Sequence, residues 1–256
     1  MLSDIIPGSL QDFQAMEDRK KYFWRRKAIE AIAGRCEASG KTGIVAGHLM
    51  FWNQRAEPVY TDDDLEIYTH IFYLHARPEV VAEHRKHDDK KRPNLSIDHL
   101  AQWQSAELSE CHRLCLENSI LFTILREPAL KRTLRLIRDV EQHDDEHNLE
   151  LAQKKLDETM LSMQNGLLTM LLLDGDKTLA AQDTANLFWK TWQSDCNEVL
   201  LNDPLETLFS SPMGYSYTAF RQATILYETV SDEEYEDICE KIASEVSIHP
   251  EFVTGG

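Results

Sequence analysis

Two carboxylates stand two residues apart at the end of an apolar run, in a pattern suited to phosphate chemistry. The segment Leu171–Leu179 reads LLLDGDKTL. Side chains at the carboxyl end of a buried parallel strand converge where open α/β sheets place their ligands. Such a pair, Asp174 and Asp176, can hold Mg²⁺, which prefers oxygen ligands, while one carboxylate attacks phosphorus and the other transfers a proton. The alternative interpretation is an ordinary Asp-Gly turn that follows a buried strand.

A second segment, Gly34–Gly43, ends in the Gly-Lys-Thr that closes a phosphate-binding P-loop. The P-loop pattern needs its first glycine at position 35, which is Arg35. A working P-loop also precedes a helix, whereas apolar residues recur every four positions from Trp24 to Cys36 and predict a helix that ends here. We therefore interpret Gly40 as a left-handed helix end and expect no nucleotide site at this turn.

The elements around these turns predict a chain of the α/β class. Three short apolar runs, at Ile44–Phe51, Thr69–Leu74 and Ser119–Leu125, alternate with helical patterns. This order predicts a parallel sheet with helices on its faces. After the helical stretch from Leu130, a further strand is predicted at Leu167–Leu173. Later helices are predicted around residues 185–192, 218–230 and 233–246.

The segment with the two carboxylates resembles the first motif of the haloacid dehalogenase-like phosphohydrolases, an apolar strand ending in Asp-x-Asp-x-Thr. The resemblance implies that Asp174 is the nucleophile that forms an aspartyl-phosphate and that Asp176 is the general acid and base. It also implies that both carboxylates bind Mg²⁺, while Lys177 and Thr178 shape the turn or contact the phosphate. The later motifs of that superfamily are missing after Leu179. Two hypotheses follow: a Mg²⁺-dependent phosphatase acting on a phosphate monoester, or a non-catalytic remnant or binding module.

The first 140 or so residues resemble the adenylate- and gluconate-kinase-like branch of P-loop kinases. This resemblance implies that His48 is a substrate-side residue and that Arg85 and Arg92 belong to a basic lid that clamps phosphates. It also places the true P-loop and its strand before the point at which this sequence begins. We therefore expect neither kinase activity nor ATP binding.

The whole order resembles fungal fusion proteins that join such a kinase-like domain to a haloacid dehalogenase-like, phosphoserine-phosphatase-like domain. The matching stretches are Val45–Trp52, Asp98–Gln104 and Ser210–Gln222. We predict an incomplete P-loop-kinase-like parallel sheet with helices over residues 1–145, without its P-loop. A helical connector over 146–165 leads to the start of a haloacid dehalogenase-like domain with a helical cap over 166–256.

The loop Ser210–Tyr217 is dense in hydroxyl groups and precedes a helix that carries Arg221. Two interpretations stay open for this segment. It is either a cap loop that selects the substrate, with Arg221 contacting it, or only a turn and a helix cap.

Composition limits the classes of partner. The 256 residues carry a net charge of −17, from 44 acidic and 27 basic side chains. This balance speaks against nucleic-acid binding as the main function, because that affinity comes from clustered Lys and Arg. No apolar run is long enough to cross a bilayer, and five cysteines, an odd number, indicate a reducing compartment. We expect a cytoplasmic protein whose partner is a small phosphorylated substrate or a completing protein, with no membrane involved.

Overall fold

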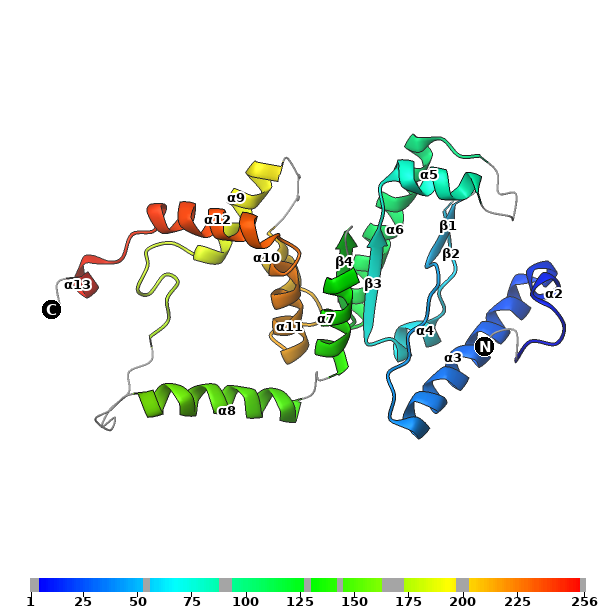
Figure 1. The fold of residues 1–256 in the computed structure, drawn as a ribbon, viewed down its shortest axis with the longest axis horizontal. Helices are drawn as coiled ribbons and strands as arrows, with labels where there is room; N and C mark the ends of the chain where they lie inside the picture. The colour runs from blue at the N-terminus through cyan, green and yellow to red at the C-terminus, as the bar shows by residue number, and fades with distance from the viewer. Residues whose placement is uncertain are drawn as a thin grey trace. The chain divides into compact units, whose positions relative to one another are not determined.

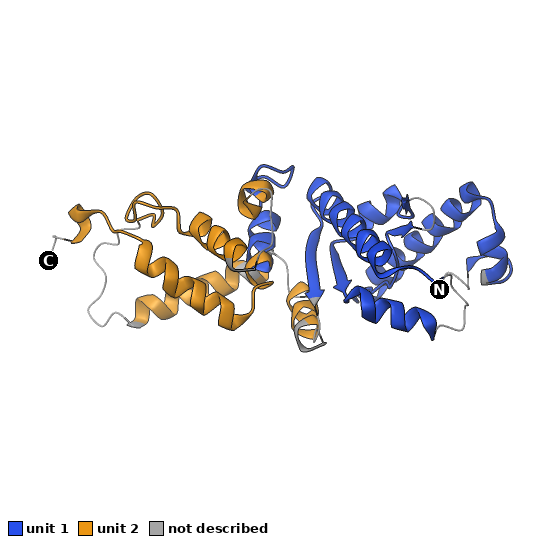
Figure 2. Ribbon diagram, turned by 90° about the horizontal axis from the view of Figure 1, so that it is seen from above, with its two compact units in different colours: residues 1–130, 209–225 blue, residues 131–208, 226–256 orange. Residues whose placement is uncertain are grey.

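The computed structural model describes residues 5–52, 56–87, 94–126, 130–141, 145–162, 173–196 and 203–253. The chain forms two compact units: residues 1–130 with 209–225, and residues 131–208 with 226–256 (Figure 2). Both units are mainly helical. Among the described residues, strands β1 to β4 all lie in the first unit. The two units follow from which residues pack together, and they do not test the predicted domain boundaries near residues 145 and 165. Those boundaries stay predictions.

The first unit contains a small parallel sheet (Figure 1). Strands β3 (His70–His75) and β4 (Leu121–Arg126) pair in parallel over their whole length, from His70 opposite Leu121 to His75 opposite Arg126. Helix α6 (Ile97–Glu117) packs on both strands and buries Cys111 and Cys115 against them. Two of the predicted strands and their parallel arrangement are therefore confirmed.

Helix ends in this unit follow the signals in the sequence. Helix α3 (Asp18–Ser39) ends at Gly40, whose φ of 61° and ψ of 25° are left-handed, as predicted. Ser96 caps α6 by accepting the His99 N–H at 3.1 Å, as expected of a serine directly before a helix. The remaining helices wholly within residues 1–130 are α2 (Leu10–Ala15), α4 (Asp62–Ile67) and α5 (Pro78–Lys86).

The predicted buried strand at Ile44–Phe51 is wrong for most of its length. Strand β1 covers only Met50–Trp52, and it pairs antiparallel with β2 (Ala56–Pro58) instead of joining the parallel sheet. Residues 41–48 have no regular structure, and the side chains of Ile44 and Val45 are 74% and 41% exposed. A strand depends on neighbours that pair with it more than on its composition, and these residues pair with no strand in the described part of the chain.

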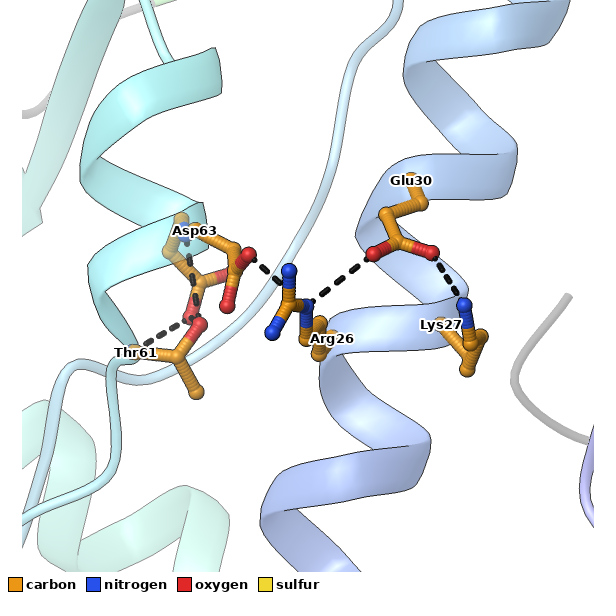
Figure 3. A network of polar contacts seen from close by, with 6 residues as sticks. Arg26, Lys27, Glu30, Thr61 and Asp63 are labelled. Atoms are coloured by element: carbon orange, nitrogen blue, oxygen red, sulfur yellow. Dashed lines mark hydrogen bonds and ion pairs between the residues drawn. The ribbon is translucent and has the colours of Figure 1, made fainter.

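Helix α3 is fastened to α4 by a polar network (Figure 3). The Arg26 Nε atom lies 3.0 Å from Glu30 Oε1 and 3.1 Å from Asp63 Oδ1. Asp64 is buried and accepts both the N–H and the hydroxyl of Thr61, at 2.7 and 3.0 Å. The contact between Arg26 and Asp63 joins the two helices, and Arg25 adds a second one, with its Nε 3.6 Å from Asp64 Oδ2.

Helix α11 (Tyr217–Tyr227) brings a distant segment to the sheet of the first unit. The Leu121 N–H donates to Thr69 on the β3 side, so the Phe122 backbone faces the opposite edge of β4. There the Phe122 N–H donates to Gln222 Oε1 at 2.7 Å, and Gln222 Nε2 donates to the Phe122 carbonyl at 2.9 Å. At this one position, a buried amide side chain thus bonds the strand backbone as a neighbouring strand would.

The second unit is helical in the part of the chain that the structure describes. Its aromatic core joins α9 (Thr184–Cys196) to α12 (Asp232–Glu245) and contains Phe188, Trp189, Trp192, Val230, Ile238 and Ile242. The unit also includes α7 (Leu130–Glu141), α8 (Asp145–Ser162), α10 (Pro204–Phe209) and α13 (Pro250–Val253). The helices predicted around 185–192, 218–230 and 233–246 are confirmed, as is the helical pattern after Leu130. The predicted strand Leu167–Leu173 lies outside the described residues except for Leu173, which is exposed.

Candidate functional site

The predicted carboxylate turn is a compact loop in the second unit. The Gly175 carbonyl accepts two N–H groups, from Leu179 at 3.0 Å and from Ala180 at 2.9 Å. The backbone of Lys177 is left-handed, with a φ of 57°. Its N–H donates to the Gln182 carbonyl at 3.2 Å. The backbone therefore closes on itself before α9 begins.

The two carboxylates of the turn lie in different surroundings. Asp176 is half-buried, and its Oδ1 accepts the Thr184 N–H at 3.1 Å. Thr184 is the first residue of α9, where backbone N–H groups lack helical partners and favour a negative charge. Asp174 is exposed. Within the described residues, no hydrogen bond or ion pair is found for the Asp174 carboxylate.

Lys177 is held by a residue that the sequence analysis did not select. Its Nζ lies 2.9 Å from Asp183 Oδ2, while Asp183 Oδ1 accepts the Asn186 N–H at 3.0 Å. The hydrogen bond from Lys177 lowers the pKa of the Asp183 carboxyl, and the same bond raises the pKa of Lys177. Asp183 thus caps α9 and orients Lys177. A cap residue one position before a predicted helix is the sequence signal that could have identified it.

The C-terminal segment supports the turn from the other side. The Ala181 N–H donates to the Ser247 carbonyl and the His249 N–H donates to the Leu179 carbonyl, both at 3.0 Å. Gln182 Oε1 accepts the Ser247 N–H at 3.1 Å. These partners are about 65 residues apart, and no local pattern in the sequence predicts them.

Most of the other predicted site residues lie in the first unit. His48 is exposed and packs on the Phe51 ring, with centroids 5.4 Å apart. Arg85, on α5, places its guanidinium 5.9 Å from the centroid of the Trp103 ring, a cation–π contact. Arg221 is half-buried on α11. Thr178 is exposed in the carboxylate turn, and Arg92 lies outside the described residues.

Helix α6 contains polar residues that the sequence analysis missed, and they hold β1 through its backbone. Glu107 Oε1 accepts the N–H groups of Leu49 and Met50 at 3.3 and 3.1 Å. Trp103 Nε1 donates to the Met50 carbonyl at 3.3 Å, and His99 Nε2 lies 3.2 Å from the Trp52 carbonyl. Their spacing of four residues on one helix face is a signal in the sequence, but it does not identify the strand that they contact.

In the described residues, neither a cysteine nucleophile nor a cluster of metal ligands is supported. Burial raises the pKa of the Cys111 and Cys115 thiols to about 12, so neither supplies a thiolate at neutral pH. Among the described residues, no group of three or more His, Cys, Asp or Glu side chains is arranged to hold a metal ion.

Residues 5–101 match the family model described as an AAA domain, which is a P-loop kinase-like domain. The match includes the Gly40-Lys41-Thr42 turn and ends well before Asp174. No curated protein and no solved structure matches the chain. In the described part of the chain, no helix combines the length and apolar character that a membrane span requires.

Proposed function

We propose that the carboxylate turn of the second unit is the site of a Mg²⁺-dependent phosphohydrolase that acts on a small phosphate monoester. Asp174 is the nucleophile, Asp176 is the general acid and base, and Thr178 contacts the transferred phosphate. This proposal is independent of the AAA domain match, which covers residues 5–101.

One observation carries the proposal: the two carboxylates of a single turn are held differently. The Thr184 N–H fixes Asp176, whereas Asp174 is exposed. A nucleophile must reach the substrate, while a proton-transfer group must stay oriented toward the leaving oxygen. The division between an open and an oriented carboxylate is the arrangement that these two roles require.

The donor set of the turn fits Mg²⁺. This ion keeps several water ligands and is commonly bound by one or two carboxylates together with substrate phosphate oxygens, so a cluster of three protein ligands is not needed. Asp174 and Asp176 would hold it. When bound, the ion would offset the negative charge of the phosphate that the aspartate attacks.

The reaction has two steps. An Asp174 carboxylate oxygen bonds to phosphorus as the ester P–O bond breaks, and Asp176 gives its proton to the departing alcohol oxygen. Asp176 then takes a proton from water, whose oxygen attacks the phosphorus of the aspartyl-phosphate. Inorganic phosphate leaves and the Asp174 carboxylate is restored. Lys177, which is engaged by Asp183, keeps the turn in shape during both steps.

The test compares hydrolysis of p-nitrophenyl phosphate, with and without Mg²⁺, by the wild type and two matched variants. Asp174→Asn should lower kcat/KM on the order of 10³-fold or more, because it removes the nucleophile. Asp157→Asn makes the same change at an exposed position of α8 and should leave the activity unchanged. Equal rates for both variants would contradict the assignment of Asp174.

A binding module without catalysis is the second candidate. The observation that favours it is that Lys177 and Asp176 both bond to the start of α9, as in a turn whose role is structural. Absence of Mg²⁺-dependent turnover in the wild type would support this candidate and contradict the phosphohydrolase.

A further inference from the structure

An exposed aromatic surface lies in the segment that joins the first unit from far along the chain. Phe209, Tyr215 and Phe220 form it, and we name these three residues the aromatic platform. The Phe209 and Tyr215 rings stack with centroids 4.9 Å apart and planes 10° apart, and Phe220 lies 5.3 Å from Phe209. Tyr215 is 82% exposed and Phe220 is 56% exposed. One face of the Phe209–Tyr215 stack is therefore free for a flat ligand.

The loop that carries the platform is shaped before any ligand arrives. The Ser211 carbonyl accepts the Gly214 N–H at 3.0 Å, and Gly214 has a left-handed φ of 53°. Met213 is buried and anchors the loop, while the Ser216 hydroxyl accepts the Ala219 N–H at 3.1 Å at the start of α11. A preformed loop loses little conformational entropy on binding.

The platform is also fixed to the first unit, in which residues 209–225 pack (Figure 2). Gln222, two residues after Phe220, is the side chain that bonds both backbone groups of Phe122 on β4. Phe220 is thus mounted on a helix that is tied to the sheet, and Tyr215 lies in the loop directly before that helix. Exposed aromatic side chains that stack on one another, on an anchored element, are typical of an interaction surface.

The platform could stack on planar cations or on planar anions, and the net charge of the chain favours the cations. The chain carries a net charge of −17, which attracts cationic partners over long range and repels nucleotides and other anions. A guanidinium is planar and stacks on aromatic faces, and its hydration is weaker than that of an ammonium. We propose that the aromatic platform is a docking site for an arginine-bearing segment of a basic partner protein.

The test is isothermal titration of the full chain with three acetylated peptides that differ only at two positions: arginine, lysine or citrulline. The arginine peptide should bind best, and the neutral citrulline peptide should bind about two- to fivefold more weakly for each residue replaced. Tyr215→Ala should weaken binding of the arginine peptide to the level of the citrulline peptide. Phe252→Ala, at an exposed ring of α13, is the matched control and should bind like the wild type.

Several outcomes would overturn the proposal. They are equal binding of the arginine and citrulline peptides, equal binding by the wild type and Tyr215→Ala, or no binding of any peptide at millimolar concentration. A concentration-dependent dimer that Tyr215→Ala abolishes would assign the platform to a second copy of the chain and overturn it as well. Because Tyr215 is exposed, its truncation leaves the buried core intact, and the tryptophan fluorescence of the variant verifies this.

Discussion

Two turns in this chain share the letters Lys-Thr soon after a glycine, yet they differ in structure. Gly40-Lys41-Thr42 follows the end of α3, and its residues are exposed. Gly175-Asp176-Lys177-Thr178 precedes α9, where Asp176 accepts an N–H of the helix and Lys177 pairs with Asp183. The first turn lies at the carbonyl end of a helix, and the second lies at the N–H end.

Because of this difference, we expect the better known motif, Gly40-Lys41-Thr42, to be the poorer phosphate site. A helix N-terminus offers free N–H groups and a positive partial charge, whereas a C-terminus offers carbonyl oxygens that repel phosphate. Gly40-Lys41-Thr42 therefore lacks the surroundings of a phosphate site, although the matched AAA domain span includes it. The side chains of Asp176 and Lys177 in the carboxylate turn are bonded to residues at the start of α9, and these bonds fix the geometry of the turn.

The largest expected effect on stability is at the second turn. Asp183→Ala removes the acceptor of the Asn186 N–H and the partner of Lys177, and should lower the free energy of unfolding by about 1–2 kcal/mol. Denaturant unfolding followed by tryptophan fluorescence measures this, because Trp189 and Trp192 lie in the core of the same unit. Lys41→Ala at the first turn is the control and should change stability by less than about 0.5 kcal/mol. Equal effects of the two variants would remove the contrast between the turns.

Substitution of the glycines should show the opposite order, with a larger loss of stability at the first turn than at the second. Gly40→Ala should cost about 1 kcal/mol, because alanine at a φ of 61° is strained even where its Cβ has open space. Gly175→Ala should cost less than about 0.5 kcal/mol, since Gly175 is not left-handed and its added Cβ meets nothing within 4 Å. Thermal and denaturant unfolding of both variants measure the two costs. A larger cost at Gly175 would reverse the comparison.

The turns should also differ in how pH affects them. The pKa of Asp183 is lowered in the folded chain by Lys177, so its contribution is complete above its unfolded pKa of about 3.9 and is lost as pH falls through the lower folded value. The stability difference between wild type and Asp183→Asn should therefore shrink in acid. Gly40→Ala acts on backbone conformation, and its cost should stay constant over the same pH series. A pH-independent difference for Asp183→Asn would contradict the ion pair.

The smallest expected effect is that of nucleotide on the first turn. Millimolar Mg-ATP should leave the melting temperature of the wild type unchanged, because only a ligand that binds the folded state raises it. Lys41→Ala should give the same result. A rise of several degrees in the wild type that Lys41→Ala abolishes would show that Gly40-Lys41-Thr42 binds nucleotide after all.

Much of the local structure could be predicted because its causes are local. The period of apolar residues and the left-handed Gly40 define α3, Ser96 starts α6, and the strands β3 and β4 follow two apolar runs. The run Ile44–Phe51 is also mostly apolar but forms a strand only at its end. The failure has a physical cause: a strand needs a neighbour, and composition does not supply one.

For the carboxylate turn, the sequence identified Asp174, Asp176 and Lys177 but not the groups that hold them. Asp183 stands beside a predicted helix and was within reach of sequence reasoning. The backbone pairing of Leu179 and Ala181 with Ser247 and His249 was not. Contacts of this kind are made by peptide groups, which every residue carries, so no side-chain pattern marks them.

By itself, the sequence determined most of the longer helices, the two parallel strands, the helix end at Gly40 and the pair of carboxylates, because propensity, capping and apolar period act over a few residues. Only the tertiary structure decided that Gln222 bonds the backbone of β4 from 100 residues away, and that Ser247 and His249 support the carboxylate turn. Those contacts depend on which surfaces meet when apolar area is buried, and hydrogen bonds between distant segments form only after that choice is made.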